Sequence, residues 1–137
     1  MYIFIRSGTS WSQQAKLLAS DAQASDNFGY SVSISGNTAV VGAHNEDAGG
    51  SNAGAAYIFE RSGTTWTEVK KIVASNPTTN DYFGQAVAID GTNVIIGSPG
   101  EDTKGTYAGA AYIFDKSATA ELKFDNYNKL SIGNAPT

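Results

Sequence analysis

Two pairs of neighbouring carboxylates, spaced 55 residues apart, are the side chains best suited to bind a metal ion. Glu46-Asp47 lies in one polar loop and Glu101-Asp102 in another (101 − 46 = 55). Calcium in proteins takes about six to eight oxygen ligands, so several carboxylate and amide oxygens must converge on one point. Two interpretations are open: oxygen ligands for calcium, or solvated loop charges, which the frequency of Glu-Asp in polar loops favours. The candidate calcium ligands are Asn45, Glu46, Asp47, Asn52, Glu101 and Asp102.

The sequence offers no constellation for catalysis. His44 is the single histidine, and the chain has no cysteine. A hydrolase triad would need His44 beside an activated serine and an acid, and no spacing indicates such a set. We therefore expect a structural or solvent-exposed histidine, no enzyme activity, and no catalytic or cofactor-binding residues.

The spacing of the acidic pairs belongs to a repeat that runs through the chain. The tripeptide Tyr-Ile-Phe occurs at residues 2–4, 57–59 and 112–114, and residues 2–56 align with 57–111 without a gap, at 25 identical positions of 55. A repeat of this length is one supersecondary unit that cannot bury its apolar face alone. The architecture therefore depends on what one unit is and on how many units the chain holds.

One repeat unit predicts four antiparallel strands. Residues 30–35 alternate apolar and polar side chains, which is the pattern of a strand with one buried face. Gly36-Asn37 suits the positive φ angles of a tight hairpin turn, and the apolar run after it indicates a strand buried on both faces. Charged residues in the fourth strand suit an exposed sheet edge. The expected strands are 30–35, 38–43, 55–61 and 66–73 in the first complete unit, and 85–90, 93–98, 107–116 and 121–125 in the second.

Four strands at this period describe a blade of a β-propeller, whose blades commonly have about 40–50 residues. We predict an all-β fold with about two and a half blades in a single repeat domain, residues 1–137. The expected parts are a half blade (1–25), a full blade (26–75), a second blade (76–117) and a diverged tail that could supply a closing strand (118–137). Closed propellers need roughly four to eight blades, so further blades of a longer chain or association of copies would complete the ring.

The composition agrees with a turn-rich all-β protein. Hydrophobic residues make up 41% and charged residues 16% of the chain, which also has 15 glycines. The net charge of −4 provides no basic surface for nucleic acid. No apolar run is long enough to span a bilayer. Met1 leads directly into the strand-like residues 2–5, which match the middle of the repeat, so we infer that the chain could be a fragment or a processed piece.

Short motifs around the first two strands of each unit resemble the FG-GAP repeat. This repeat forms the blades of the integrin α-subunit propeller and of many bacterial surface and secreted proteins, with Phe-Gly before the first strand and Gly-Ala-Pro after the second. The first unit has Phe28-Gly29 and Gly42-Ala43-His44, and the second has Phe83-Gly84 and Gly97-Ser98-Pro99. The resemblance covers residues 2–117. The matching motif residues are Phe28, Gly29, Gly42, Phe83, Gly84, Gly97 and Pro99.

The motif has a physical interpretation. Phe28 and Phe83 could wedge between neighbouring sheets, and the glycine after each lets the backbone turn into the strand. Asp26 and Asp81 precede these phenylalanines by two residues, and we expect them to cap turns rather than to bind metal.

The resemblance also implies a calcium loop, which several integrin blades carry between the first and second strands. The corresponding segments here, residues 33–38 and 88–93, are too short and contain one carboxylate between them. That calcium site is therefore not carried over to this chain.

Four aromatic residues divide into repeated and unrepeated pairs. Trp11 and Trp66 recur at the same point of the repeat, which favours packing of the outer strands over a platform for sugars. Tyr30 and Tyr107 do not recur, and unrepeated aromatics beside loops are better candidates for recognition. Tyr30 and Tyr107 are therefore the candidate binding residues.

Three functional hypotheses follow from the resemblance. The first is a non-enzymatic binding or adhesion module of a bacterial secreted or cell-surface protein, with a protein or carbohydrate ligand. The second is a structural subunit that assembles into a ring or filament through its incomplete propeller. The third is a non-catalytic propeller that accompanies a hydrolase absent from this chain. The expected partners are a ligand and either further blades or copies of the chain, with calcium as a candidate ion and no nucleic acid.

Overall fold

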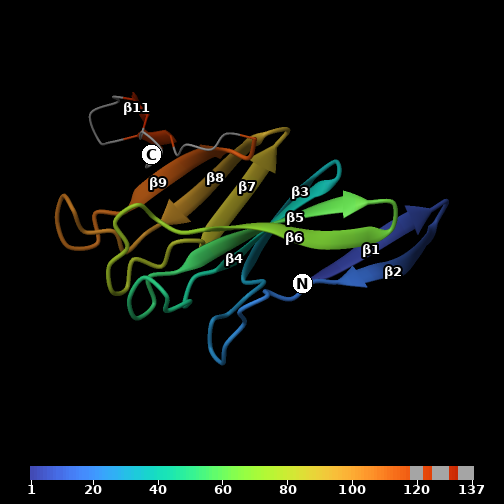
Figure 1. The fold of residues 1–137 in the computed structure, drawn as a ribbon, viewed down its shortest axis with the longest axis horizontal. Coiled ribbons are helices and arrows are strands. Elements are labelled where there is room, and N and C mark those ends of the chain that lie inside the picture. Colours follow the sequence, from blue (N-terminus) through green and yellow to red (C-terminus); the bar gives the residue numbers. More distant parts are fainter. Residues whose placement is uncertain (118–121, 125–129, 133–137) are drawn as a thin grey trace.

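The computed structural model describes residues 1–117, 122–124 and 130–132, which form eleven β-strands and no helix (Figure 1). The strands make three antiparallel sheets, with orders β1-β2, β3-β4-β5-β6 and β7-β8-β9-β10-β11. This confirms the predicted all-β fold of propeller blades. The strands are β1 (Tyr2–Ser7), β2 (Ser10–Lys16), β3 (Ser31–Ser35), β4 (Thr38–Ala43), β5 (Ala55–Ser62), β6 (Thr65–Ile72), β7 (Ala86–Asp90), β8 (Asn93–Ser98), β9 (Ala110–Asp115), β10 (Leu122–Phe124) and β11 (Leu130–Ile132).

The middle sheet is a complete four-stranded blade. All six residues of β4 are buried, as its apolar sequence predicts. β6 forms one edge of this sheet. Its charged side chains discourage a strand of another molecule from pairing with this exposed edge. A bulge between Ile58 and Phe59 interrupts the register of β5 with β6, and the β1-β2 pair has its own bulge at the equivalent step, between Ile3 and Phe4. The N-terminal hairpin therefore has the geometry of the third and fourth strands of a blade.

The third sheet begins with the first three strands of a blade, β7, β8 and β9. Residues 122–124 of the predicted strand 121–125 form β10, which pairs with β9, whereas Glu121 and Asp125 lie outside the described residues. β11 extends this sheet beyond four strands, which the sequence did not predict.

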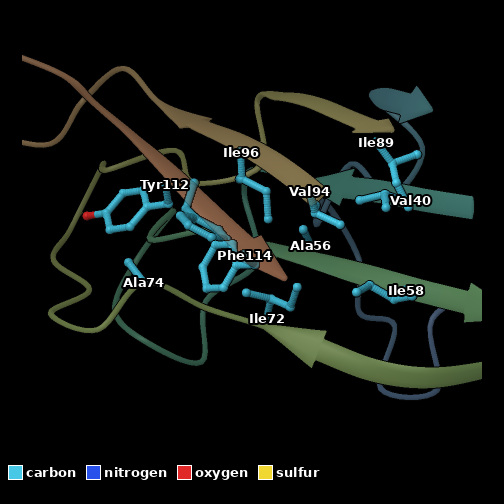
Figure 2. Close-up of a cluster of buried hydrophobic side chains, with 11 residues drawn as sticks. Val40, Ala56, Ile58, Ile72, Ala74, Ile89, Val94, Ile96, Tyr112 and Phe114 are labelled. Carbon is cyan, nitrogen blue, oxygen red and sulfur yellow. The ribbon is translucent and has the colours of Figure 1, made fainter. Parts of the chain in front are cut away.

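An apolar core fills the space between the middle and third sheets. Figure 2 shows side chains of the two sheets pointing toward each other. Phe83, which is fully buried, packs its ring edge-on against Tyr112 and Phe114 with centroid distances of 5.2 and 6.1 Å. Edge-to-face contacts of this kind add stability to that of the buried area. The cluster consists of Val40, Ala56, Ile58, Ile72, Ala74, Phe83, Ile89, Val94, Ile96, Tyr112 and Phe114.

A second core lies between the N-terminal hairpin and the middle sheet, and it uses equivalent positions of the repeat. The hairpin and the segment after it contribute Ile3, Leu17 and Ala19. The residues 55 positions later, Ile58, Ile72 and Ala74, make the corresponding face of the middle sheet. One contact surface is therefore used twice along the chain, which is the packing rule of a repeat protein.

The prediction that β3 buries its apolar face is wrong. Val32 and Ile34 are 49% and 53% exposed, whereas their counterparts Val87 and Ile89 pack against the core between the sheets. The reason lies in the neighbouring sheet: the N-terminal sheet has two strands, and neither covers β3. Alternation identified the strand correctly, but burial of its apolar face depends on a neighbour that the described residues do not provide.

Candidate functional site

The loops that join successive strands at one end of the sheets gather most of the predicted site residues. The tight hairpin turns at Gly8, Gly36, Gly63 and Gly91 occupy the opposite strand ends. We call the surface formed by the longer loops the loop end. It consists of residues 17–30, 44–54, 73–85 and 99–109.

An aromatic group forms where the loops of the middle and third sheets meet. The ring of His44, which follows β4, lies 4.2 Å from that of Tyr30 and 6.1 Å from that of Tyr82, between centroids. The His44 side chain is buried, its Nδ1 atom has no hydrogen-bond partner among the described residues, and its burial lowers the pKa. Tyr30 is 63% exposed and presents an aromatic surface to solvent. His44 is thus a structural residue beneath a candidate binding residue.

Asn80 joins this aromatic group to the next loop. Its Oδ1 atom accepts hydrogen bonds from Asn52 Nδ2 at 3.0 Å and from the Tyr82 hydroxyl at 3.4 Å. The backbone amide of Asn80 donates to Ser51 O at 2.8 Å. Asn80 is therefore held in place through its backbone and through its side-chain oxygen. Its side-chain nitrogen, Nδ2, makes no hydrogen bond within the described residues.

A pocket of about 180 Å³ is lined in part by Asn80. Tyr107, the second predicted binding residue, borders it and is 65% exposed. A Cβ atom on Gly100 would lie 1.8 Å from the carbonyl oxygen of Asn80, so only glycine permits the close approach of these two loops. The lining residues are Thr79, Asn80, Gly100, Asp102, Thr106 and Tyr107.

Two tyrosines of the second repeat occupy left-handed backbone conformations. Tyr82 and Tyr107 have φ angles of 55° and 55°, and their counterparts Asn27 and Asn52 have 57° and 54°. Asparagine adopts this conformation readily, whereas a bulky aromatic residue is strained there. Strain of this kind clusters at functional sites, which directs attention to the loop end of the third sheet.

The glutamate of each acidic pair is buried and hydrogen-bonded. Glu46 is 4% exposed, and its Oε1 atom accepts hydrogen bonds from Lys71 Nζ at 2.9 Å and from the Ala48 amide at 3.1 Å. Glu101 is 6% exposed and accepts a hydrogen bond from the Thr103 hydroxyl. The interpretation of solvated loop charges is therefore wrong for both glutamates, because each lies beneath its own loop and bonds to it.

Asp47 and Asp102 are the exposed members of these pairs. Asp47 accepts a hydrogen bond from the backbone amide of Asn52 at 2.7 Å. Within the described part of the chain, no three carboxylate, histidine or cysteine side chains converge on a common point. Calcium needs several oxygens at one centre, and calcium binding by this chain stays a prediction.

Lys71 links the N-terminal segment to the middle sheet. Its Nζ atom lies 2.6 Å from Asp21 Oδ2, and the Tyr57 hydroxyl donates to Asp21 Oδ1 at 2.8 Å. Burial alone would lower the pKa of Lys71, but its hydrogen bonds to Asp21 and Glu46 outweigh burial and raise it. Burial and the bond to Asp21 raise the pKa of Tyr57, and the bond from Lys71 lowers that of Asp21. These shifts arise from an ion-pair network that joins the N-terminal segment to the middle sheet.

The remaining motif residues have structural positions. Asp26 Oδ2 accepts from the Gln23 amide and Asp81 Oδ2 from the Thr78 amide, both at 2.7 Å, so each caps a turn as predicted. Trp66 packs on the N-terminal hairpin and donates to Gln14 Oε1 at 2.9 Å, whereas Trp11 is 65% exposed. The packing prediction therefore applies to Trp66 alone.

The sequence analysis missed Thr79, Asn80 and Tyr82. A signal was present in the aligned repeats, because Asn27 and Asn52 of the first copy become tyrosines in the second. Asparagine that aligns with an aromatic residue in a turn can indicate a left-handed position adapted for a purpose beyond folding.

Comparison with known proteins places these features in a family. The FG-GAP repeat pattern matches residues 11–59 and 66–114, two segments spaced by the same 55 residues as the internal repeat (66 − 11 = 55). No curated protein matches the chain. Domains of this repeat type are commonly extracellular and typically non-catalytic. Among the described residues there is no helix with the length and apolar character of a membrane span. Because the matched segments cover most of the sequence, the chain belongs to the FG-GAP repeat family.

Proposed function

We propose that the chain is a non-catalytic binding module of a secreted or cell-surface protein, and that it recognises a protein or carbohydrate partner with its loop end. The observation that carries this proposal is the exposure of Tyr30 and Tyr107, at 63% and 65%, on loops that the sheets hold in place. Exposed aromatic rings on a rigid scaffold supply contact area at low entropic cost. Neither tyrosine is needed by the repeat, since Gln85 and Asn52 occupy the equivalent positions.

The loop end is suited to binding because it is preorganised. His44 and Tyr82 support Tyr30, and Asn80 connects this group to the pocket beside Tyr107. A surface fixed in this way loses little conformational freedom when a partner binds. The partner would therefore contact two tyrosines on neighbouring sheets.

Panels of immobilised extracellular matrix proteins and glycans, probed with the fluorescently labelled chain, test this proposal. We expect binding to at least one class, and loss of that binding in the double variant Tyr30→Ala/Tyr107→Ala. Trp11→Ala is the matched control, because Trp11 is as exposed as Tyr107 but lies beside a hairpin turn away from the loop end. Unchanged binding by the double variant would refute a role for the loop end.

Self-assembly is the second candidate function, and a separate observation favours it. Tyr2, Phe4, Val32 and Ile34 are exposed on one outer face, and Ile95 is 46% exposed on the other. Tyr57 and Phe59, the counterparts of Tyr2 and Phe4, are buried between sheets, so the outer faces match surfaces that already pack within the chain. Exposed apolar patches of this kind mark interaction sites.

Mass in solution tests self-assembly directly. Light scattering over a range of concentrations would show a defined multimer or a growing filament, and Ile34→Lys would reduce the mass to that of a monomer. A monomer at every concentration would exclude this function and leave the binding module unaffected.

A further inference from the structure

We propose that the pocket beside Tyr107 is a subsite for one neutral hexopyranose unit of a saccharide. This inference rests on the proposed function, because it names the class of ligand for one part of the loop end. The pocket lies between residues 79–80, in the segment that joins β6 to β7, and residues 100–107, in the loop that joins β8 to β9.

The size of the pocket suits one sugar ring. Its volume is about 180 Å³, whereas sites for drug-sized ligands occupy about 300–1,000 Å³. A single pyranose ring would fit here, with neighbouring units of a longer saccharide extending into solvent.

Tyr107 supplies the apolar surface that a sugar requires. Pyranose rings carry C–H groups on one face, and these groups pack against the face of an aromatic ring. Tyr107 is 65% exposed and has a φ angle of 55°, while Asn52 has the same backbone conformation in the first repeat. The scaffold therefore needs only an asparagine at this place, and the strained tyrosine points to a use for its ring.

The polar groups around the pocket match a pair of sugar hydroxyls. Asp102 offers carboxylate acceptors, and Asn80 Nδ2 offers a donor because its Oδ1 atom is engaged by Asn52 and Tyr82. Thr79 and Thr106 add hydroxyls that both donate and accept. Within the described residues, the side chains of Thr79, Asp102, Thr106 and Tyr107 make no hydrogen bonds of their own, so all four are available to a ligand.

The charge of the pocket selects neutral sugars. Asp102 is the one carboxylate among the lining residues, and the lining contains no cation. Lys104 belongs to the same loop but does not line the pocket. An anionic sugar would place its carboxylate near Asp102 without compensation, which is unfavourable. A single carboxylate is likewise too few for calcium.

The two repeats diverge where the pocket requires it. Asp102 aligns with Asp47 and Thr106 with Ser51, so the loop framework is kept. The other lining residues differ in type between the copies: Thr79, Asn80, Gly100 and Tyr107 align with Ala24, Ser25, Asn45 and Asn52. Two lining residues keep their type in both repeats, and the other four differ. This pattern indicates that the pocket is a specialised feature of the second blade and not a property of every blade.

Saturation-transfer NMR and calorimetry on the whole chain test this proposal with the methyl glycosides of glucose, galactose, mannose and N-acetylglucosamine, and with glucuronic acid as the anionic comparison. We expect saturation transfer to at least one neutral glycoside, and affinity roughly tenfold or more lower in Tyr107→Asn and Asp102→Asn. Tyr107→Asn restores the residue of the first repeat, so it should fold. Tyr107→Phe should retain binding, because it keeps the aromatic face, and Trp11→Ala should not alter it.

Three results would overturn the inference: no saturation transfer to any neutral glycoside, equal binding by Tyr107→Asn, or preferred binding of glucuronic acid. Its failure is distinguishable from that of the proposed function. Binding of a matrix protein that Tyr30→Ala/Tyr107→Ala abolishes, without binding of any glycoside, would uphold the binding module and exclude the sugar subsite.

Discussion

Gly42 of β4 and Gly84, which precedes β7, lie so close across the boundary between two sheets that a Cβ atom on Gly42 would sit 1.9 Å from the carbonyl oxygen of Gly84. The same carbonyl accepts a hydrogen bond from the Ser31 hydroxyl at 2.8 Å. Gly42 belongs to the Gly-Ala part of one repeat and Gly84 to the Phe-Gly part of the next. The two halves of the family motif therefore meet in one contact between successive blades.

This contact predicts that Gly42→Ala destabilises the protein by about 2–3 kcal/mol, in the range of overpacked cores. The clash is with backbone atoms, which cannot move aside without separating the sheets. Gly97→Ala is the matched control, because Gly97 is the counterpart of Gly42 and its added Cβ would lie 3.6 Å from that of Ala86, an ordinary contact. Urea unfolding followed by tryptophan fluorescence measures both, and equal losses in the two variants would contradict the prediction.

The strand positions could be predicted from the sequence, but the burial of each strand face could not. Strand positions follow from alternation and from turn glycines, both of which are local properties of the sequence. The exposure of Val32 and Ile34 could not be predicted in this way, because it depends on the two strands that the N-terminal sheet lacks. Periodicity shows that a face is apolar, but only the neighbouring sheet determines whether water reaches it.

The candidate site could be predicted in part, for a related reason. The unrepeated residues Tyr30 and Tyr107 were identified by comparing the repeats, and both lie on the loop end. The burial of Glu46 depends on Lys71, which is 25 positions away in sequence and reaches it through the fold. Asn80 was missed because its role arises from contacts with Ser51 and Asn52 of one loop and from the close approach of Gly100 of another.

The ion pair of Lys71 with Glu46 predicts a large effect when one partner is removed. Lys71→Met would leave the buried Glu46 carboxylate without its cation, and we expect a loss of about 2–3 kcal/mol. This is less than the roughly 3–5 kcal/mol of a fully buried pair, because the Lys71 side chain is 25% exposed. The pair with Asp21, whose side chain is 44% exposed, contributes little to this loss.

A double-mutant cycle separates the ion pair from other effects of the Lys71 substitution. Lys71→Met/Glu46→Gln should be less destabilised than the sum of the two single variants, since the neutral amide no longer needs a cation. Urea unfolding of the four proteins at pH 7 provides the measurement. Additive losses would show that the two side chains contribute independently.

His44 predicts a dependence of stability on pH. Burial lowers its pKa in the folded protein below the ordinary value of 6.5, so the folded state keeps the ring neutral where the unfolded chain binds a proton. Above pH 6.5 the ring is neutral in both states, and His44 has no effect on the pH dependence of stability. As the pH drops from 6.5 toward the pKa of the folded protein, the free energy of unfolding falls by at most about 1.4 kcal/mol per pH unit.

His44→Gln should reduce the dependence of stability on pH between pH 6.5 and pH 5.5, because it removes the single histidine of the chain, whereas the Met1 amino group, whose pKa burial lowers, contributes equally in both proteins. Urea unfolding of both proteins across this range would show a smaller slope in the variant. Identical slopes would mean that His44 is protonated as easily in the folded protein as in the unfolded chain.

Tyr107 predicts a conflict between stability and binding. A non-glycine residue in the left-handed region costs about 1–3 kcal/mol, and asparagine avoids part of this cost. Because Tyr107 is 65% exposed and makes no aromatic contact within the described residues, its replacement removes strain and little packing. Tyr107→Asn should therefore raise the free energy of unfolding by about 0.5–1 kcal/mol.

Tyr82→Asn is the comparison: it relieves the strain of the same φ angle but loses the contact with His44, so its gain in stability should be smaller or absent. If thermal melting showed Tyr107→Asn to be less stable than the wild type, the tyrosine would be there for the fold, and the case for a sugar-binding ring would lose its premise.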